Sequence, residues 1–332
     1  MKLYKRIIVL IGIIAAVPVW ADQGFLKAGI GAGFDSNIFG DGDNISGIIG
    51  NVKLAGEGVT DGELFKLHGG IAIDAEANPY YFLLDASAGA GMILTPDIYT
   101  LFRVNAGYNF RMYINHSLDI GLIIKRDLGT AITADLSYGY QPVFSLSGTS
   151  NESVLGHSVN GGLSIALADS LSVLAHGGYG IRNYFELPYS GDILRNRNWA
   201  VECGILLLPD YDTSVKAAYS YTSYLSSSQS FTVYSTTNML YLYNDAEVHS
   251  IALEAGLDIG FDVSFRLMGK IDFIRLIAVS QYETAYLAVL KTDIFLDPSW
   301  KMEIPITFSG MSGAVSQSYA RLKAGVDIFY LF

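Results

Sequence analysis

Residues 26–35 read LKAGIGAGFD, with an apolar residue at every second position and a polar residue or glycine between. The same alternation returns at 65–74 (FKLHGGIAID) and at 251–259 (IALEAGLDI). Successive side chains of a β-strand point to opposite faces, so each segment has one apolar face and one polar face. A helix would need a period of 3.6 residues, which the chain does not sustain. We therefore expect a protein built from strands.

The composition adds a second constraint. Of the 332 residues, 51% are hydrophobic and only 16% are charged, so the chain is too apolar to be disordered. After residue 21, however, no uninterrupted apolar stretch is long enough for a membrane-spanning helix. The net charge of -11 argues against a nucleic-acid partner, which would need a basic surface. The chain is apolar overall but nowhere apolar for long.

The first 21 residues have the pattern of a cleaved export signal. A basic start and an apolar run at 7–19 precede the small residue Ala21, which suits signal peptidase. The alternative is an N-terminal anchor helix, for which this run is short. We expect residues 22–332 to form one domain outside the reducing cytoplasm. Its single cysteine, Cys203, falls on an apolar face and has no partner for an internal disulfide.

Turn signals and longer polar stretches divide the mature chain. Tight turns, each containing Asp, are expected at 60–62, 95–97, 127–129, 168–170, 209–211, 260–262 and 297–299. Loops are expected at 35–46, 77–81, 112–117, 141–157, 183–197, 223–247, 276–283 and 310–318. Together they join about sixteen strands of about ten residues, the length that crosses a bilayer when tilted. About fourteen strands are the alternative if 223–247 or 276–296 is misread.

The charges test this assignment of faces. On the expected strands, 14 basic and 14 acidic residues fall on the polar face, and Arg275 alone, at a strand end, falls on the apolar face. A soluble β-sandwich also alternates, but its inner face carries large aliphatic side chains rather than so much Gly and Ala. The apolar face is therefore expected to meet lipid, which does not tolerate charge. The predicted fold is all-β, a transmembrane antiparallel up-and-down β-barrel.

A barrel of this size encloses an aqueous channel that its own side chains do not fill. Equal numbers of bases and acids predict a hydrated pore of weak ion preference, whereas two stripes of opposite charge would create a transverse field. The sequence leaves the arrangement open. The residues expected to line the pore are Lys27, Lys53, Lys66, Asp74, Asp85, Arg103, Arg111, Asp119, Lys125, Asp135, Arg182, Glu202, Lys216, Glu254, Asp258, Arg266, Lys270, Asp272, Lys291, Asp293, Lys301, Glu303, Arg321, Lys323 and Asp327.

Aromatic residues and histidines complete the pattern. Aromatics on the apolar face gather near the loop-side strand ends, as in the girdle at a membrane interface, although aromatics also favour strands in general. His68 and His176 are expected to face the lumen, His116 and His157 to lie in loops, and His249 near a strand start. No spacing implies a catalytic triad or a metal site, so we expect no enzyme activity, cofactor or metal.

The chain ends in a strand in which Tyr330 and Phe332 alternate with polar residues. This strand resembles the C-terminal signal of bacterial outer-membrane β-barrels of the porin-like superfamily, and the barrel pattern covers nearly all of residues 23–332. The resemblance implies that the barrel-assembly machinery reads Tyr330 and Phe332. A weaker resemblance, in 31–37 (GAGFDSN), is to the barrel domains of surface-lipoprotein assembly modifiers. That motif also reads as an Asx turn, and the helical repeat domain of those proteins is lacking here.

The sequence thus predicts a channel in the bacterial outer membrane, surrounded by lipid, for passive diffusion of small hydrophilic solutes. The alternative is a non-enzymatic barrel for export, assembly or adhesion of surface molecules. The longest loops, 141–157, 183–197 and 223–247, are candidates for a constriction, with flexible surface loops as the alternative. The constriction-loop sequence of trimeric porins is not found, so a homo-oligomer is left open.

Overall fold

The computed structural model describes residues 23–37, 45–60, 62, 65–112, 115–145, 153–185, 194–226, 245–260, 262–277, 280–313 and 318–332. The expected signal peptide, residues 1–21, lies outside them. The strands are β1 (Gln23–Asp35), β2 (Gly47–Val59), β3 (Phe65–Ala77), β4 (Phe82–Asp97), β5 (Thr100–Arg111), β6 (Asn115–Asp127), β7 (Ile132–Ser145), β8 (Ser153–Ala168), β9 (Leu171–Phe185), β10 (Leu194–Leu207), β11 (Thr213–Ser226), β12 (Ala246–Ile259), β13 (Val263–Leu276), β14 (Gln281–Asp297), β15 (Trp300–Gly313) and β16 (Tyr319–Leu331).

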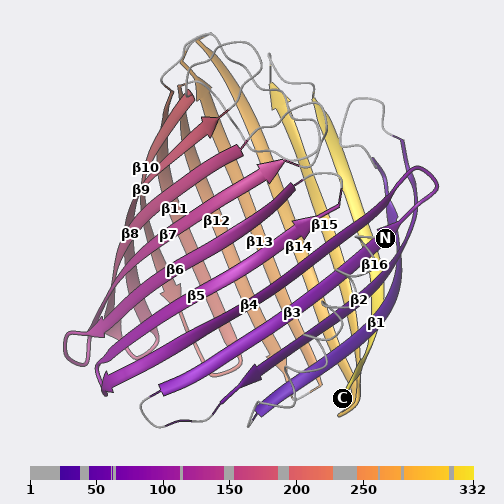
Figure 1. Ribbon diagram of the computed structural model, residues 1–332, viewed down its shortest axis with the longest axis horizontal. Coiled ribbons are helices and arrows are strands. Elements are labelled where there is room, and N and C mark those ends of the chain that lie inside the picture. The colour runs from indigo at the N-terminus through magenta and orange to yellow at the C-terminus, as the bar shows by residue number, and fades with distance from the viewer. Residues whose placement is uncertain are drawn as a thin grey trace.

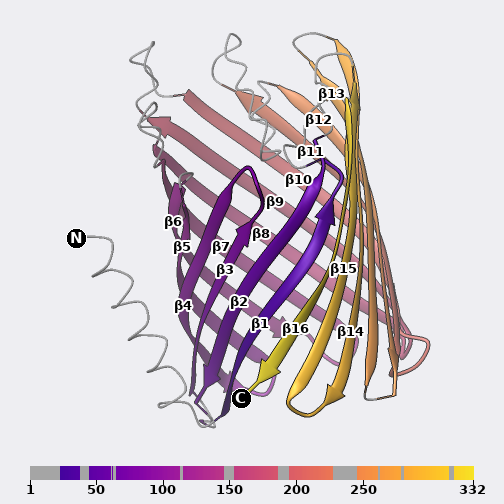
Figure 2. The ribbon, with the colours of Figure 1, turned by 90° about the vertical axis from the view of Figure 1, so that its right-hand side faces the viewer.

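The strands form one closed antiparallel barrel. Each strand pairs with its neighbours in sequence, and β1 pairs with β16 to complete the ring. Figures 1 and 2 show the tilted strands, and Figure 2 looks onto the seam where β1 and β16 lie side by side. The expected barrel is confirmed with sixteen strands, and the alternative of fourteen is excluded. No helix in the described ranges has the length and apolar character needed to cross a membrane.

The strand ends match the expected tight turns but not the expected loop boundaries. β4 ends at Asp97 and β5 begins at Thr100, for example, as the turn signal at 95–97 predicts. On the loop side the strands run further than expected, so that the interval predicted as 141–157 shrinks to 146–152. Alternation fades there because both faces of a strand beyond the bilayer meet water, while the backbone ladder continues.

The two faces of the wall differ as expected. Side chains such as Ile30, Val201 and Leu253 are exposed on the convex face, at 68%, 49% and 46%. Charged side chains of the opposite face bridge strands that are not neighbours: Lys53 of β2 reaches Asp327 of β16 across β1. Because the ring is closed and the apolar side chains are exposed on its outside, the opposite, polar face is the lumenal one.

Because the strands are longer than expected, more charged residues lie on the convex face than the sequence predicts. Arg275 is not alone there, because Arg197 and Glu247 also lie on loop-side strand extensions that were expected to be loops. Arg275 Nη1 lies 3.1 Å from Glu247 Oε2. These residues sit at the ends of strands, where long side chains reach the aqueous interface. The free Cys203 is exposed, and its neighbours Val201 and Ile205 are exposed as well.

The motif at the end of β1 has a structural role in the seam. The Asn37 backbone N–H donates to Asp35 Oδ1 at 2.9 Å, which forms the Asx turn that the sequence suggests. Ser36 and Leu322 exchange hydrogen bonds, since the Ser36 N–H donates to the Leu322 carbonyl and the Leu322 N–H to Ser36 Oγ. The Phe332 N–H donates to the Leu26 carbonyl at 2.9 Å. Both ends of β16 are therefore tied to β1.

Candidate pore and its lining

The charged residues expected to line the pore lie on the lumenal face of their strands. Cross-strand partners share a face, and the register places Lys53, Asp74, Asp85 and Arg111 in one row across β2, β3, β4 and β5. Arg111 binds Asp85 with two parallel hydrogen bonds of 3.0 and 3.1 Å. Alternation carries the same face through the other strands.

We call the lumenal surface of β14–β16 and β1–β3 the ion-paired wall. Glu303 is its centre: the Nζ atoms of Lys301, Lys291 and Lys27 lie 2.8, 2.9 and 3.7 Å from its carboxylate oxygens. The Nζ atoms of Lys301 and Lys291 lie 3.1 and 3.3 Å from the carboxylate oxygens of Asp293. Three lysines thus share two carboxylates, so that both carboxylates are compensated and the group keeps one net positive charge.

Three more ion pairs cross the seam between the first and last strands. Lys53 Nζ lies 2.5 Å from Asp327 Oδ2, Lys323 Nζ 2.6 Å from Glu76 Oε2, and Arg321 Nη2 2.5 Å from Asp35 Oδ2. Asp35 and Asp327 have almost no exposed surface, at 0% and 2%. Bases and acids therefore interleave on this wall, which answers the question that the sequence leaves open. They do not form two stripes.

The remaining expected residues divide into pairs and separate groups. Pairs form between neighbouring strands for Lys216 and Glu202 and for Arg266 and Asp258, and within β13 for Lys270 and Asp272, while Glu254 lies 4.0 Å from Lys216. For Lys125 and Arg182 the described part of the chain contains no ion pair.

Just outside the strands, burial and a hydrogen bond to Glu76 raise the pKa of the Tyr81 hydroxyl group.

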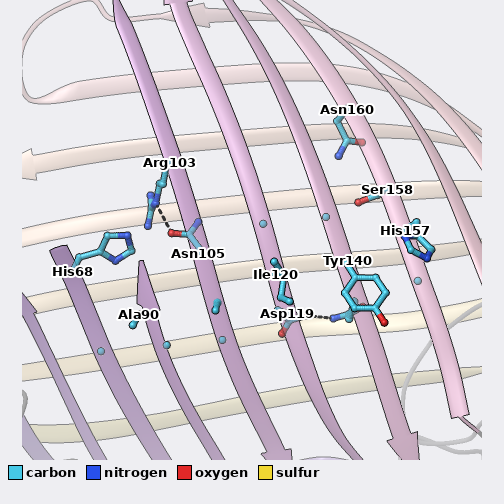
Figure 3. A pocket seen from close by; sticks show the side chains of 18 of the residues that line it. His68, Ala90, Arg103, Asn105, Asp119, Ile120, Tyr140, His157, Ser158 and Asn160 are labelled. Carbon is cyan, nitrogen blue, oxygen red and sulfur yellow. Dashed lines mark hydrogen bonds between the residues drawn. The ribbon is translucent and has the colours of Figure 1, made fainter. Parts of the chain in front are cut away.

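A cavity of about 840 Å³ follows the lumenal surface from β2 to β10. Its chemistry differs from that of the ion-paired wall, because amide side chains and bare glycine backbone make up much of the lining. Figure 3 shows His68 on β3 and Arg103 and Asn105 on β5, with Ser158 and Asn160 of β8 further along the same wall. Amide groups, rather than ions of opposite sign, bind two of the charged side chains here, Asp119 and Arg103.

Two examples show how the charges of this cavity are held. Asp119 accepts hydrogen bonds from the amide groups of Gln141, at 2.6 Å, and of Asn109. Arg103 Nε donates to Asn105 Oδ1 at 3.0 Å. The alternation that predicts Asp119 and Arg103 on the lumenal face also places these amides there. Asparagine and glutamine at these positions, however, do not by themselves indicate a binding site, so the sequence alone does not identify them as site residues.

Two histidines face the lumen and three face outward. The rings of His68 and His176 lie on the lumenal side, as expected, and His176 lies 3.9 Å from both Asp135 and Glu202. Of the described residues, no three His, Cys, Asp or Glu side chains gather as a metal site would require.

The outward histidines form a repeated contact that the sequence does not reveal. His116 and His157 lie on strands β6 and β8, not in loops as expected, and His249 lies near the start of β12. Each accepts or donates a hydrogen bond with a tyrosine of the adjacent strand: Tyr108, Tyr138 and Tyr219 at 3.4, 2.9 and 2.7 Å. Tyrosine and histidine rings thus pair within the aromatic zone at the loop-side end.

A small apolar cluster lies on the lumenal face near the loop-side ends of β12 to β15. It comprises Ala246, Val248, Ile274, Leu276, Ala285 and Met311. The lumenal face, which the sequence predicts to be polar, thus also carries a local apolar cluster that the sequence analysis does not single out. Most of the loop 223–247, and the central parts of 141–157 and 183–197, lie outside the described residues, so the constriction they were expected to form stays a prediction.

Comparison with known proteins places the fold. No family model and no curated protein matches the chain. The outer membrane channel DcaP of Acinetobacter baumannii superposes with a TM-score of 0.56 at 12% identity, over 93% of this chain and 96% of that one. OccAB4 of Acinetobacter baumannii superposes with a TM-score of 0.55 at 8% identity, over 95% of this chain and 100% of that one. A bacterial polysaccharide outer membrane secretin superposes with a TM-score of 0.54 at 9% identity, over 94% of this chain and 99% of that one.

These identities are low, so the likeness is one of fold. Two of these structures are named as outer-membrane proteins, and one of them as a channel. This chain accordingly shares with them the fold of a closed antiparallel β-barrel. The weaker resemblance of 31–37 to assembly modifiers stays a prediction, and the structure gives that motif a role in closing the seam.

Proposed function

We propose that the protein is a non-enzymatic outer-membrane channel through which small hydrophilic solutes diffuse passively. The observation that carries the proposal is the cavity of about 840 Å³ on the lumenal side of a wall whose outer face is apolar. Polar groups on one face and lipid-compatible groups on the other are what an aqueous pore across a bilayer requires. The fold that the chain shares with outer-membrane channels supports the same function.

The charge arrangement supports weak ion selectivity. Bases and acids of the ion-paired wall lie 2.5 to 3.7 Å apart, so that their fields largely cancel a few ångströms into the lumen. A passing cation and a passing anion then meet similar potentials. We propose that the pore distinguishes solutes by size and hydrogen bonding more than by the sign of their charge.

A planar bilayer tests both statements. The purified full-length protein, refolded and inserted, should give stepwise conductance increases, and under a gradient of potassium chloride the reversal potential should stay close to zero. A folded protein that leaves the bilayer silent would exclude the channel. In that case co-purification of a surface molecule or a partner protein would favour export or assembly. A strong reversal potential would exclude the balanced pore.

The remaining parts of the proposal concern targeting. We propose that residues 1–21 are removed on export to the outer membrane and that Tyr330 and Phe332 are read by the barrel-assembly machinery. What supports the second point is that the ring of Tyr330 contacts that of Phe332, with centroids 4.6 Å apart, at the end of the closing strand. Whether the barrel forms a homo-oligomer stays a prediction.

A further inference from the structure

The cavity follows one unbroken row of cross-strand partners, which we call the diagonal track. Every step in it is a paired position of neighbouring strands. In order from β3 to β10 the row is His68, Gly91, Asn105, Gly121, Gly139, Ser158, Gly180 and Asn198. Polar side chains and glycines thus share one line across eight strands.

The diagonal track connects the two ends of the barrel. His68 is near the start of β3, just after a turn, whereas Asn198 is near the start of β10, just after a loop. Because the strands are tilted, a line perpendicular to them climbs from the turn side to the loop side. Seven steps between strands, each roughly 4.8 Å, give a path of about 34 Å along the wall. This length suits an extended molecule better than a compact one.

Glycines on the track make room for polar side chains to lie flat. A Cβ atom at Gly91 would overlap His68 Nε2 and come within 2.5 Å of Asn105 Oδ1, and one at Gly180 would overlap Asn198 Oδ1. At Gly121, by contrast, the nearest atom to an added Cβ is the Tyr138 carbonyl oxygen, 3.9 Å away. Polar side chains therefore lie over Gly91, Gly139 and Gly180, and of the four glycines in the row Gly121 alone leaves open space.

The residues around the cavity are rich in glycine and neutral in charge. Nine of the 28 lining residues are glycines, against 35 of 332 in the chain, so the floor is largely bare backbone. The charged residues in the lining are Glu57, Asp119, Arg103 and Arg182, whose formal charges cancel. Four amides, Asn105, Gln141, Asn160 and Asn198, supply both donors and acceptors.

One polar atom of the track has an unmet hydrogen bond. His68 Nε2 is buried and finds no hydrogen-bond partner among the described residues. A buried polar atom without a partner is costly, so a hydroxyl group or a water molecule at this position would be stabilising. A solute with many hydroxyl groups could supply it while also pairing with Asn105.

We propose that the diagonal track binds a linear, uncharged, polyhydroxylated solute, an oligosaccharide in chemical class, and guides it between the two mouths of the barrel. The inference rests on the proposed channel function and names its substrate class. Hydroxyl groups donate and accept, which matches the amide side chains. The cancelled charges favour a neutral chain, and the length of the row favours several sugar units over one.

Current block in a planar bilayer tests the proposal on the full-length protein. Maltohexaose is added to an open channel, with glucose as the short control and hexagalacturonic acid as the acidic control. The expected half-blocking concentration of maltohexaose is lower than that of glucose by about tenfold or more, because several hydrogen bonds form at once. It should also be lower than that of the acidic chain.

Two pairs of variants separate recognition from general narrowing. Combined substitution of Asn105→Ala, Asn160→Ala and Asn198→Ala should raise the half-blocking concentration of maltohexaose by about tenfold, whereas Thr307→Val, on the lumenal face of β15, should leave that concentration unchanged. Gly121→Phe fills open floor on the track. It should weaken the block, whereas Ala252→Phe, on the lumenal face of β12 outside the track, should narrow the pore without weakening it.

The outcomes distinguish this inference from the channel function itself. Absence of conductance steps overturns the proposed function. Normal steps with equal block by glucose and maltohexaose overturn the diagonal track as a binding site and leave the channel standing. Tighter block by hexagalacturonic acid overturns the neutral substrate class. Equal effects of Gly121→Phe and Ala252→Phe on block would show that binding occurs elsewhere in the lumen.

Discussion

Lys53 Nζ lies 2.5 Å from Asp327 Oδ2, and the pair spans the strand β1 that separates their own strands. The two residues are 274 positions apart in the chain. The side chains cross above the glycines of β1, where Gly31 stands opposite Asp327 on one side and Asn51 on the other. The ring is therefore closed by side chains as well as by the backbone ladder of β1 and β16.

Removing the lysine should destabilise the barrel. Lys53→Met leaves Asp327, which is 2% exposed, without the cation that compensates its charge. We expect the free energy of unfolding in lipid vesicles to fall by about 3 kcal/mol, measured by urea titration and tryptophan fluorescence. Lys125→Met is the matched control and should change it by less than about 0.5 kcal/mol. A double variant with Asp327→Asn should recover part of the loss; additive losses would contradict the pairing.

The glycine beneath this pair should tolerate no side chain. A Cβ atom at Gly31 would overlap Asp327 Oδ1 and come within 2.7 Å of Asn51 Oδ1, so Gly31→Ala forces the seam to shift. The expected loss of stability is about 1–3 kcal/mol, seen as a lower thermal unfolding temperature by circular dichroism. Gly50→Ala, on the neighbouring strand, has nothing within 4 Å and should be neutral. Equal effects at the two positions would argue against cross-seam crowding.

The assignment of faces predicts opposite results at adjacent residues. Leu253→Arg places a charge on the exposed apolar face in the middle of β12 and should cost about 2–4 kcal/mol in a bilayer. Ala252→Arg places the same charge on the lumenal face, opposite Lys270, and should be tolerated much better. Folding yield into vesicles, read by the heat-induced mobility shift on gels, measures both. Equal losses would overturn the register.

The terminal residue should affect assembly in the cell more than stability. The side chain of Phe332 is 69% exposed, so Phe332→Ala should change the unfolding free energy of the refolded barrel by less than about 1 kcal/mol. The amount found in the outer membrane should fall several-fold, because the terminal aromatic is the feature by which the chain resembles assembly signals. Phe308→Ala, a lipid-facing aromatic away from the terminus, is the control. An unchanged level in the membrane would contradict the signal.

Much of the fold is predictable because lipid imposes a simple rule. Charge is expensive on the lipid face, so the parity of Lys27, Lys66 or Asp119 reports the face of a whole strand. The turn signals are equally local, and the turn at 95–97 lies where expected. The loop boundaries fail because alternation ends at the bilayer surface, whereas the strand does not. His116 and His157 were misplaced for this reason.

The candidate pore likewise combines features that the sequence predicts with features that only the structure shows. That Lys301, Lys291 and Glu303 face inward follows from alternation, but their mutual contact at 2.8 and 2.9 Å follows from the register of β14 against β15. Likewise, Asn105 and Asn198 are unremarkable in sequence. Only the stagger of successive strands brings them into one line with His68.

The sequence by itself determined a barrel of about sixteen strands, with fourteen as the alternative, and with an apolar outside and a polar inside, because a period of two and a lipid solvent are properties of each strand taken alone. The tertiary structure decided which groups meet or align: Lys53 pairs with Asp327 across the seam, and His68 falls into one cross-strand row with Asn198 at its far end. Such partners depend on how far each strand is shifted against the next around the whole ring, and that shift is set only when β1 pairs with β16.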